Sequence, residues 1–185
     1  VRDLSWINRN IPDEANCIVT DVTSAEAVFS LMGPKSRDLL GDITSDSLSN
    51  DEFPFGTAKE IEIGMGLARA HRISYVGELG WELYVPTDMA RHVFDVILES
   101  GGDKELQFCG MHVLDSCRLE KGYRHFGHDI TDEDHVLEAG LGFCVKLNKP
   151  SSKFGNFIGR DAVLEKKDQG LSRRLVQSKL RDPSP

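Results

Sequence analysis

Residues 59–85 carry the pattern that most limits how this chain can fold. Apolar and polar side chains alternate along residues 59–73 and again along residues 81–85, and glycines interrupt the pattern between them. Alternation with a period of two is typical of β-strands that bury one face. The pattern therefore predicts an antiparallel β-meander, with a tight turn bounded by Gly77 and Gly80 ahead of its last strand.

The rest of the chain is expected to add helices and further strands to this meander. Pro86 should end the meander, and Thr87 is a good N-cap for the helix that follows. The predicted helices are residues 34–40, 88–99, 110–121 and 160–167, and the predicted additional strands are residues 27–32, 141–147 and 174–179. Antiparallel β-meanders with packed helices define an α+β fold, not a doubly wound parallel sheet.

Length and charge narrow the classes of function. A chain of 185 residues can bury a sizeable core without a disulfide or a metal. Acidic side chains outnumber basic ones by 30 to 22, for a formal net charge of −8, whereas nucleic-acid binding depends on basic side chains that neutralise phosphates. No apolar run approaches the roughly 20 residues that a membrane helix needs. We therefore expect neither nucleic acid nor a membrane as a partner.

Generic motifs for metal binding and catalysis are weak in this sequence. His125, His128 and Asp129 are three possible metal ligands, but their surroundings are typical of a loop and lack a second ligand pair at zinc spacing. Surface or hydrogen-bonded histidines are the alternative, and we predict no metal site. The four cysteines form no C-x-x-C motif, which fits a reducing compartment.

Residues 74–84 hold the most informative group of side chains. Strand alternation places Glu82 and Tyr84 on one face, and Trp81 and Leu83 on the other. A carboxylate can accept two parallel hydrogen bonds from a ring N–H and an adjacent amino group, and a phenol ring offers stacking area for a flat heteroaromatic ligand. The alternative is an exposed hairpin whose carboxylates are merely solvated.

Five segments follow one another as they do in the aminomethyltransferase (glycine cleavage T-protein) folate-binding superfamily. They are residues 29–40, 74–84, 115–124, 137–141 and 157–162. Through these segments, which extend over nearly the whole chain, the sequence resembles that superfamily. It is most similar to the C-terminal folate domain of dimethylglycine and sarcosine dehydrogenases, and the resemblance implies part of an aminomethyltransferase folate-binding domain.

The resemblance also implies a ligand and the residues that hold it. Members of the superfamily bind tetrahydrofolate in a central tunnel, and the matching positions here are Tyr75, Glu82, Leu83 and Tyr84. Glu82 would accept hydrogen bonds from the amino and ring N–H groups of the pterin. The aspartate that assists methylene transfer in the family lies ahead of the position matching Val1, so we assign no catalytic residue to this chain.

Other matching positions leave a choice of roles. Arg118 and Glu120 would either contact the ligand or form an ion pair that braces the meander, and Glu138 is predicted to be a buried, structural carboxylate. Stand-alone T-proteins usually carry an extra folate-binding arginine four positions before the one matching Arg118. Because this chain has Leu114 there, the resemblance favours the branch that is fused to a dehydrogenase.

The function implied by the resemblance is the tetrahydrofolate-binding portion of a FAD-linked dimethylglycine/sarcosine dehydrogenase-like enzyme. This portion would capture the one-carbon unit of an oxidised N-methyl group as 5,10-methylenetetrahydrofolate, and FAD would belong to an upstream domain. The alternatives are a stand-alone aminomethyltransferase of the glycine cleavage system and a non-catalytic regulatory homologue. The implied partners are folate, a small N-methylated amine and the N-terminal part of the same polypeptide.

The resemblance also bears on the limits of the chain, which begins at Val1 without a methionine. We expect residues 1–170 to be part of the folate-binding domain, and residues 171–185 to start a C-terminal β-barrel domain or a linker. The isolated chain is expected to bind folate weakly and to have no activity by itself. Its compartment would be the bacterial cytoplasm or the eukaryotic mitochondrial matrix.

Overall fold

The computed structural model describes residues 2–148 and 157–182. The chain forms two compact units, called unit 1 (Val1–Leu114) and unit 2 (Asp115–Pro185). The domain boundary expected near residue 170 stays a prediction. No described helix combines the length and the apolar character needed to cross a membrane.

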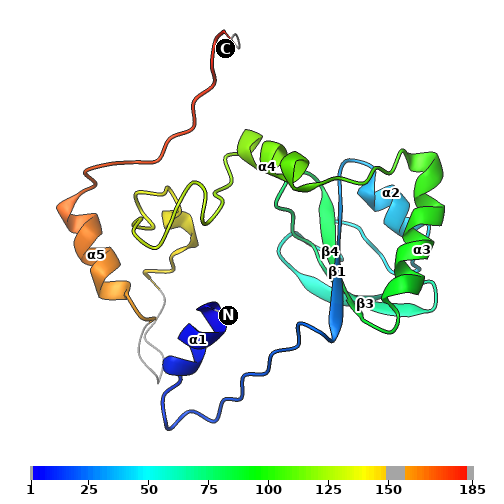
Figure 1. The fold of residues 1–185 in the computed structure, drawn as a ribbon, viewed down its shortest axis with the longest axis horizontal. Helices are drawn as coiled ribbons and strands as arrows, with labels where there is room; N and C mark the ends of the chain where they lie inside the picture. Colours follow the sequence, from blue (N-terminus) through cyan, green and yellow to red (C-terminus); the bar gives the residue numbers. More distant parts are fainter. Residues whose placement is uncertain (1, 149–156, 183–185) are drawn as a thin grey trace. The chain divides into compact units, whose positions relative to one another are not determined.

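Unit 1 contains a four-stranded antiparallel sheet. Its strands are β1 (Glu26–Met32), β2 (Ala58–Ile63), β3 (Gly66–His71) and β4 (Gly80–Pro86). They lie side by side in the order β1-β4-β3-β2, so that β4 is paired on both edges (Figure 1). The meander and the additional strand near residues 27–32 predicted from the sequence are confirmed.

Helices cover one face of this sheet. Unit 1 contains α1 (Arg2–Arg9), α2 (Ser36–Gly41), α3 (Ala90–Gly101) and a short 3₁₀ helix (Gly102–Lys104). α3 contacts α2 and the three strands β1, β3 and β4, and Figure 1 shows α2 and α3 on the same side of the sheet. The mixed, antiparallel architecture is the predicted α+β fold.

The apolar core of unit 1 lies between the sheet and the helices α2 and α3. Alternation along the strands supplies its sheet side, because every second side chain points toward the helices. The largest side chains that are fully buried are Trp81, Phe53, Leu40, Ile61, Ile63, Leu83, Val85 and Val93. The Phe53 and Trp81 rings meet at a centroid distance of 6.1 Å, which fastens the loop before β2 onto the sheet.

The connection between β3 and β4 requires glycine at two positions. Gly77 has a φ of +72°, a backbone conformation that residues with a side chain rarely adopt. A Cβ at Gly80 would lie 2.8 Å from the Leu31 carbonyl oxygen of β1. The two glycines therefore have the structural role predicted for them, one in the turn and the other where two backbones approach closely.

The prediction that Thr87 caps the following helix is wrong. Helix α3 begins at Ala90 with Met89 as its N-cap, and no side chain caps it by a hydrogen bond. The Thr87 hydroxyl instead donates to the Ser24 carbonyl at 2.9 Å. The Thr87 amide also donates to the Ala25 carbonyl at 3.0 Å, so this residue continues the pairing of β4 with the chain before β1.

Unit 2 has little regular structure among its described residues. Its elements are α4 (Met111–Glu120), which begins shortly before the unit does, a 3₁₀ helix (Gly142–Cys144) and α5 (Arg160–Gln169). Helices were predicted at about these places for α4 and α5. The strands predicted at residues 141–147 and 174–179 are wrong, since neither run forms a strand.

Both wrong predictions have the same physical reason. The run at residues 141–147 is apolar, but Phe143 is 79% exposed, so this run does not supply a buried sheet face. In residues 174–179, the Leu175 amide donates one hydrogen bond to the Glu138 carbonyl at 2.8 Å. No further strand pairing follows among the described residues. Apolar composition without a partner strand does not make a sheet.

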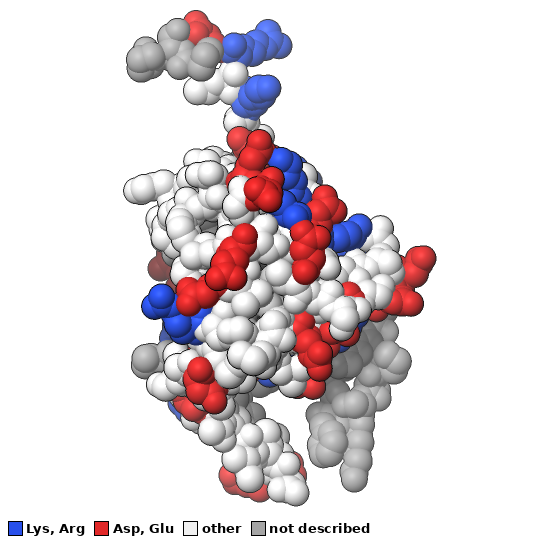
Figure 2. Space-filling model, turned by 90° about the vertical axis from the view of Figure 1, so that its right-hand side faces the viewer, with Lys and Arg blue, Asp and Glu red and all other residues white. Residues whose placement is uncertain are grey.

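The acidic balance of the sequence is visible on the surface. On the face drawn in Figure 2, acidic side chains lie between the basic ones, and the described residues form no continuous basic patch there. This distribution agrees with the formal net charge of −8.

Candidate functional site

Strand β4 presents its polar side chains on the sheet face opposite to the core. Trp81 and Leu83 are fully buried, whereas Glu82 and Tyr84 are half-buried on the other, open face. The predicted separation of the two faces is therefore confirmed. The strand register places Glu82 between Ser30 of β1 and His71 of β3.

The side chains of Glu82 and Tyr84 form a hydrogen-bonded pair on this open face. The Tyr84 hydroxyl donates to Glu82 Oε2 at 3.1 Å. Burial raises the pKa of Tyr84, and both the hydrogen bond to Glu82 and the negative charge of that carboxylate raise it further. Tyr84 therefore remains a neutral donor at physiological pH, and the carboxylate keeps lone pairs for other donors.

Two residues of β3 flank the Tyr84 ring. Arg69, which lies opposite Tyr84 in the register, places its guanidinium carbon 5.1 Å from the ring centroid. The His71 ring lies 4.7 Å from the Tyr84 ring at an angle of 39°. Both contacts hold the phenol ring against the sheet.

Arg69 links this group to the edge strand β1. Its Nη2 atom lies 2.8 Å from a carboxylate oxygen of Glu26, and its Nε donates to His71 Nε2 at 3.2 Å. Glu26, Arg69 and His71 were not singled out by the sequence analysis. The alternation within β3 could have placed Arg69 and His71 on one face, but their position beside Tyr84 depends on the register between strands.

A cavity of about 880 Å³ opens beside Tyr84. Its volume is in the range of ligand pockets. The residues that line it come from α1, from the segment before β1 and from the open face of the sheet, and they are Leu4, Ser5, Asn8, Arg9, Thr20, Asp21, Val22, Thr23, Glu26, Val28 and Tyr84. The exposed side of the sheet thus offers both a polar floor and space for a ligand.

The two other predicted site residues lie elsewhere. Tyr75 is half-buried in the connection between β3 and β4. Leu83 is fully buried in the core, and its neighbours in the register are Phe29 and Ala70. The side chain of Leu83 is therefore on the opposite face from Glu82 and Tyr84, where it supports the strand that carries them.

The further residues considered in the sequence lie in unit 2. Arg118 is 3% exposed and pairs with Asp115 at 2.6 Å and with Asp129. The alternative of an ion pair with Glu120 is wrong, because Glu120 is exposed at the end of α4 and the carboxylates that reach Arg118 are the two aspartates.

The predicted structural role of Glu138 is confirmed. Its side chain is 7% exposed, and its two oxygens lie 2.9 Å from Lys166 Nζ and 2.9 Å from Arg173 Nε. The hydrogen bond from Arg173, followed by that from Lys166, holds the pKa of Glu138 below its ordinary value. Glu138 therefore ties α5 and the chain after it to the segment before residue 140.

The histidines considered as metal ligands pair with each other. The rings of His125 and His128 stack at 4.2 Å, and His125 Nδ1 lies 3.3 Å from Asp115. Among the described residues, no three His, Cys, Asp or Glu side chains are grouped in a way that could hold a metal.

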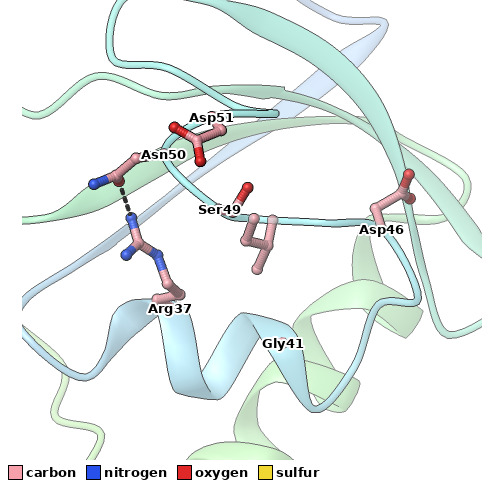
Figure 3. A pocket seen from close by; sticks show the side chains of 7 residues that line it. Arg37, Gly41, Asp46, Ser49, Asn50 and Asp51 are labelled. Carbon is pink, nitrogen blue, oxygen red and sulfur yellow. Dashed lines mark hydrogen bonds between the residues drawn. The ribbon is translucent and has the colours of Figure 1, made fainter.

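A second cavity in unit 1, of about 620 Å³, lies between α2 and the loop before β2 (Figure 3). Arg37 donates to the Asn50 side-chain oxygen at 2.7 Å, and Arg72 donates to the same oxygen at 2.8 Å. Asp46 lies at the other end of the cavity and accepts a hydrogen bond from the Glu62 amide at 3.1 Å. These side chains hold the loop in place, so the open face of the sheet is the better candidate for a ligand site.

Comparison with known proteins identifies the class. The model of the GCVT N-terminal domain family matches residues 1–149, so the chain belongs to this family. Aminomethyltransferase T of the glycine cleavage system from Bartonella henselae has a similar structure, with a TM-score of 0.66 and 29% identity, over 80% of this chain and 38% of that one. The aminomethyltransferase fold implied by the sequence is thereby confirmed.

Individual relatives come from two groups of enzymes. The 4-methylaminobutanoate oxidase (formaldehyde-forming) of Paenarthrobacter nicotinovorans is 43% identical over 90% of this chain and 20% of its own length. Human mitochondrial sarcosine dehydrogenase is 38% identical over 93% of this chain and 18% of its own length. The aminomethyltransferase of Halothermothrix orenii is 39% identical over 97% of this chain and 48% of its own length. The chain thus spans about a fifth of the oxidase and dehydrogenase and about half of the aminomethyltransferase.

Proposed function

We propose that the open face of the sheet in unit 1 binds the pterin ring of tetrahydrofolate. The observation that carries this proposal is the pair of Glu82 and Tyr84, 3.1 Å apart, beside a cavity of about 880 Å³. A carboxylate held by one neighbour can accept the parallel N–H groups of a pterin edge, and a fixed phenol ring provides stacking area. Membership of a folate-dependent family supports the same ligand.

In this proposal the other predicted residues shape the site without reacting. Tyr75 contributes to the wall near the connection between β3 and β4, and Leu83 supports the floor from the core side. In the same proposal, residues 1–170 are part of the folate-binding domain, and residues 171–185 are the start of a C-terminal β-barrel domain or a linker. None of the chain's residues is assigned a catalytic role.

The proposed reaction is capture of a one-carbon unit. We propose that the complete enzyme is a FAD-linked dehydrogenase of N-methylated amino acids, since relatives are named for acting on sarcosine, dimethylglycine and 4-methylaminobutanoate. Tetrahydrofolate would take up the released carbon as its 5,10-methylene form. The chain contributes by holding the folate nitrogens near that carbon, which is a proximity effect.

The compartment follows from the same proposal. The relatives include mitochondrial dehydrogenases of mammals and bacterial enzymes. We propose the mitochondrial matrix for a eukaryotic source and the cytoplasm for a bacterial one.

The test of this function is folate binding by the full-length protein, measured by calorimetry under anaerobic conditions. Glu82→Ala should weaken binding roughly 10- to 100-fold, because it removes charged hydrogen bonds. Glu62→Ala is the matched control, since Glu62 is an exposed glutamate of the edge strand β2. Equal folate affinity in the two variants, with both of them folded, would contradict the assignment.

A stand-alone aminomethyltransferase is the second candidate, which the 39% identity to the Halothermothrix orenii enzyme favours. Such an enzyme takes its unit from a lipoyl-bearing carrier protein and needs no flavin. The absorbance spectrum of the full-length protein separates the two candidates, because only the dehydrogenase carries FAD. Formaldehyde release with no methylene transfer would instead match the relative named as formaldehyde-forming, and a protein that binds folate without turnover would be a regulatory homologue.

A further inference from the structure

Five charged or aromatic side chains form a continuous chain of contacts across the open face of unit 1. It runs from Glu26 on β1, through Arg69 and His71 on β3, to Tyr84 and Glu82 on β4. The pair assigned to the pterin stands at one end of this chain. The three remaining residues contact the pair or one another but have no role in the function proposed above.

The hydrogen bond between Arg69 and His71 requires a neutral imidazole. Arg69 Nε is always a donor, and it lies 3.2 Å from His71 Nε2. His71 Nε2 can accept this bond only when the ring is neutral with its proton on Nδ1. A protonated ring would lose the hydrogen bond and place a second cation beside Arg69.

The same two residues determine where the Tyr84 ring lies. Arg69 stands over its face at 5.1 Å, and the His71 ring packs on it at 4.7 Å. With the ring held by both, the hydroxyl is directed to Glu82 Oε2. Because this hydrogen bond occupies one oxygen, it also sets the rotation of the carboxylate that the pterin would meet.

We propose that Arg69 and His71 are positioning residues of the folate site, and that protonation of His71 weakens pterin binding. The proposal rests on the function proposed above. His71 acts through Tyr84 and Glu82 rather than by contact with the ligand. Its neutral form keeps Arg69 and Tyr84 in place, and its charged form releases them.

The two charged groups next to His71, Arg69 and Glu82, both make its protonation unfavourable for pterin binding. On β3, Arg69 is its neighbour on the same face. On β4, His71 lies opposite Glu82 and next to Tyr84. On β2, Glu60 faces Arg69. A charged imidazole would be repelled by Arg69. It would be attracted to Glu82, where it would compete with the pterin for the carboxylate oxygens. Acid should therefore lower affinity through both routes.

Two variants of His71 distinguish the role of its hydrogen-bond acceptor from the role of its aromatic ring. In His71→Gln an amide oxygen can replace Nε2 as the acceptor for Arg69, and it does not titrate. In His71→Phe the aromatic contact with Tyr84 is kept, but the acceptor is lost. The control is Glu60→Gln, which removes a neighbouring charge from β2 and leaves the chain of contacts intact.

The experiment measures the folate dissociation constant of the full-length protein at pH 6 and pH 8. For the wild type we expect weaker binding at pH 6, by roughly fivefold for one lost hydrogen bond. His71→Gln keeps the acceptor but loses the ring contact with Tyr84, so it should bind less than about fivefold more weakly than the wild type at pH 8 and show no difference between the two pH values. His71→Phe should bind weakly at both, and Glu60→Gln should keep the wild-type ratio. Any titration of folate itself is common to all four proteins.

The outcomes distinguish this inference from the function on which it rests. If the wild type binds no folate at either pH, the proposed function fails. If the wild type binds folate and Glu82→Ala does not, but His71→Gln keeps the wild-type pH ratio, only the positioning role is overturned. Wild-type affinity in a folded His71→Phe protein would overturn it as well.

Discussion

The two units are held together by different interactions. In unit 1 the buried side chains are almost all apolar and form one cluster between the sheet and the helices α2 and α3. In the described part of unit 2 the buried residues are Arg118, Glu138 and Ala139. Two of these three carry a charge, and both charged groups are paired with side chains of opposite sign.

This difference predicts different responses to the same disturbance. Burial of apolar surface depends little on pH or salt, so unit 1 should be sensitive mainly to loss of volume in its core. Ion pairs depend on the protonation of carboxylates, and removal of one partner leaves the other uncompensated. Unit 2 should therefore respond to acid and to single charge deletions.

The largest effect on global stability is expected in the core of unit 1. Trp81 is fully buried and packs on Phe53, with the guanidinium groups of Arg37 and Arg72 each 5.9 Å from its ring. Trp81→Ala should lower the free energy of unfolding by about 3–5 kcal/mol, measured by urea denaturation. Trp6, which is 49% exposed, is the matched control, and Trp6→Ala should change it by less than about 0.5 kcal/mol. Equal losses would show that the cluster in unit 1 is not the main source of stability.

The next effect is confined to unit 2. Arg118→Met keeps most of the side-chain volume but leaves Asp115 and Asp129 without their shared cation, and it removes the donor to the Tyr123 carbonyl at 3.0 Å. Residues 122–130 should then exchange their amide hydrogens rapidly, while the amides of β3 and β4 keep their protection. Hydrogen-exchange mass spectrometry measures both, with Arg181→Met as the exposed control. Loss of protection in β4 as well would show that the two units unfold together.

The same contrast explains what could be predicted from the sequence. Strand periodicity is a property of unit 1, and it located the meander and the face that carries Glu82 and Tyr84. It could not place Arg69 and His71 beside Tyr84, because the register between strands depends on contacts across the sheet. Near Glu138 the structure depends on ion pairs with distant residues, which leave no periodic trace in the sequence.

Resemblance to a family predicted a ligand, which strand periodicity alone could not name, but it predicted the direction of individual side chains less well. It predicted folate as the ligand and Glu82 as a residue that holds it, which stays a prediction, whereas family membership is confirmed. It also included Leu83, which alternation within the strand and the structure both place in the core. A family motif marks a segment, whereas the direction of each side chain follows from the pleat.

As the pH is lowered, unit 2 should unfold at a higher pH than unit 1. The hydrogen bond from Arg118, followed by that from His125, lowers the pKa of Asp115. Burial disfavours the charged form of Asp129, but the His125 amide and Arg118 outweigh it, so the pKa of Asp129 is also lowered. A lowered folded-state pKa means that the unfolded chain binds protons more readily. The stability contributed by these groups is therefore complete above about pH 4, where unfolded aspartate titrates, and is lost as pH falls below it.

This acid transition can be followed by amide NMR spectra between pH 7 and pH 2. Signals of residues 115–140 should lose their dispersion at a higher pH than the signals of β1 to β4. In Arg118→Met the aspartates no longer gain from that cation, so less stability should remain to be lost in this range. A single transition shared by both units, unchanged in the variant, would contradict the role assigned to the ion pairs.

The smallest effect is expected from an ion pair on the surface of unit 1. Arg91 and Asp95 on α3 are four residues apart, with Nε and Oδ2 at 2.8 Å, but the Arg91 side chain is 86% exposed. A pair of this kind contributes about 0.3–0.5 kcal/mol, since solvent and salt screen it. Asp95→Ala should lower the free energy of unfolding by that amount in dilute buffer and by less in 1 M salt. Arg118 and Asp115 form a pair of similar spacing and length, at 2.6 Å, in which the arginine side chain is only 4% exposed. If Asp95→Ala proved as disruptive locally as Arg118→Met, burial would not be what distinguishes the ion pairs of the two units.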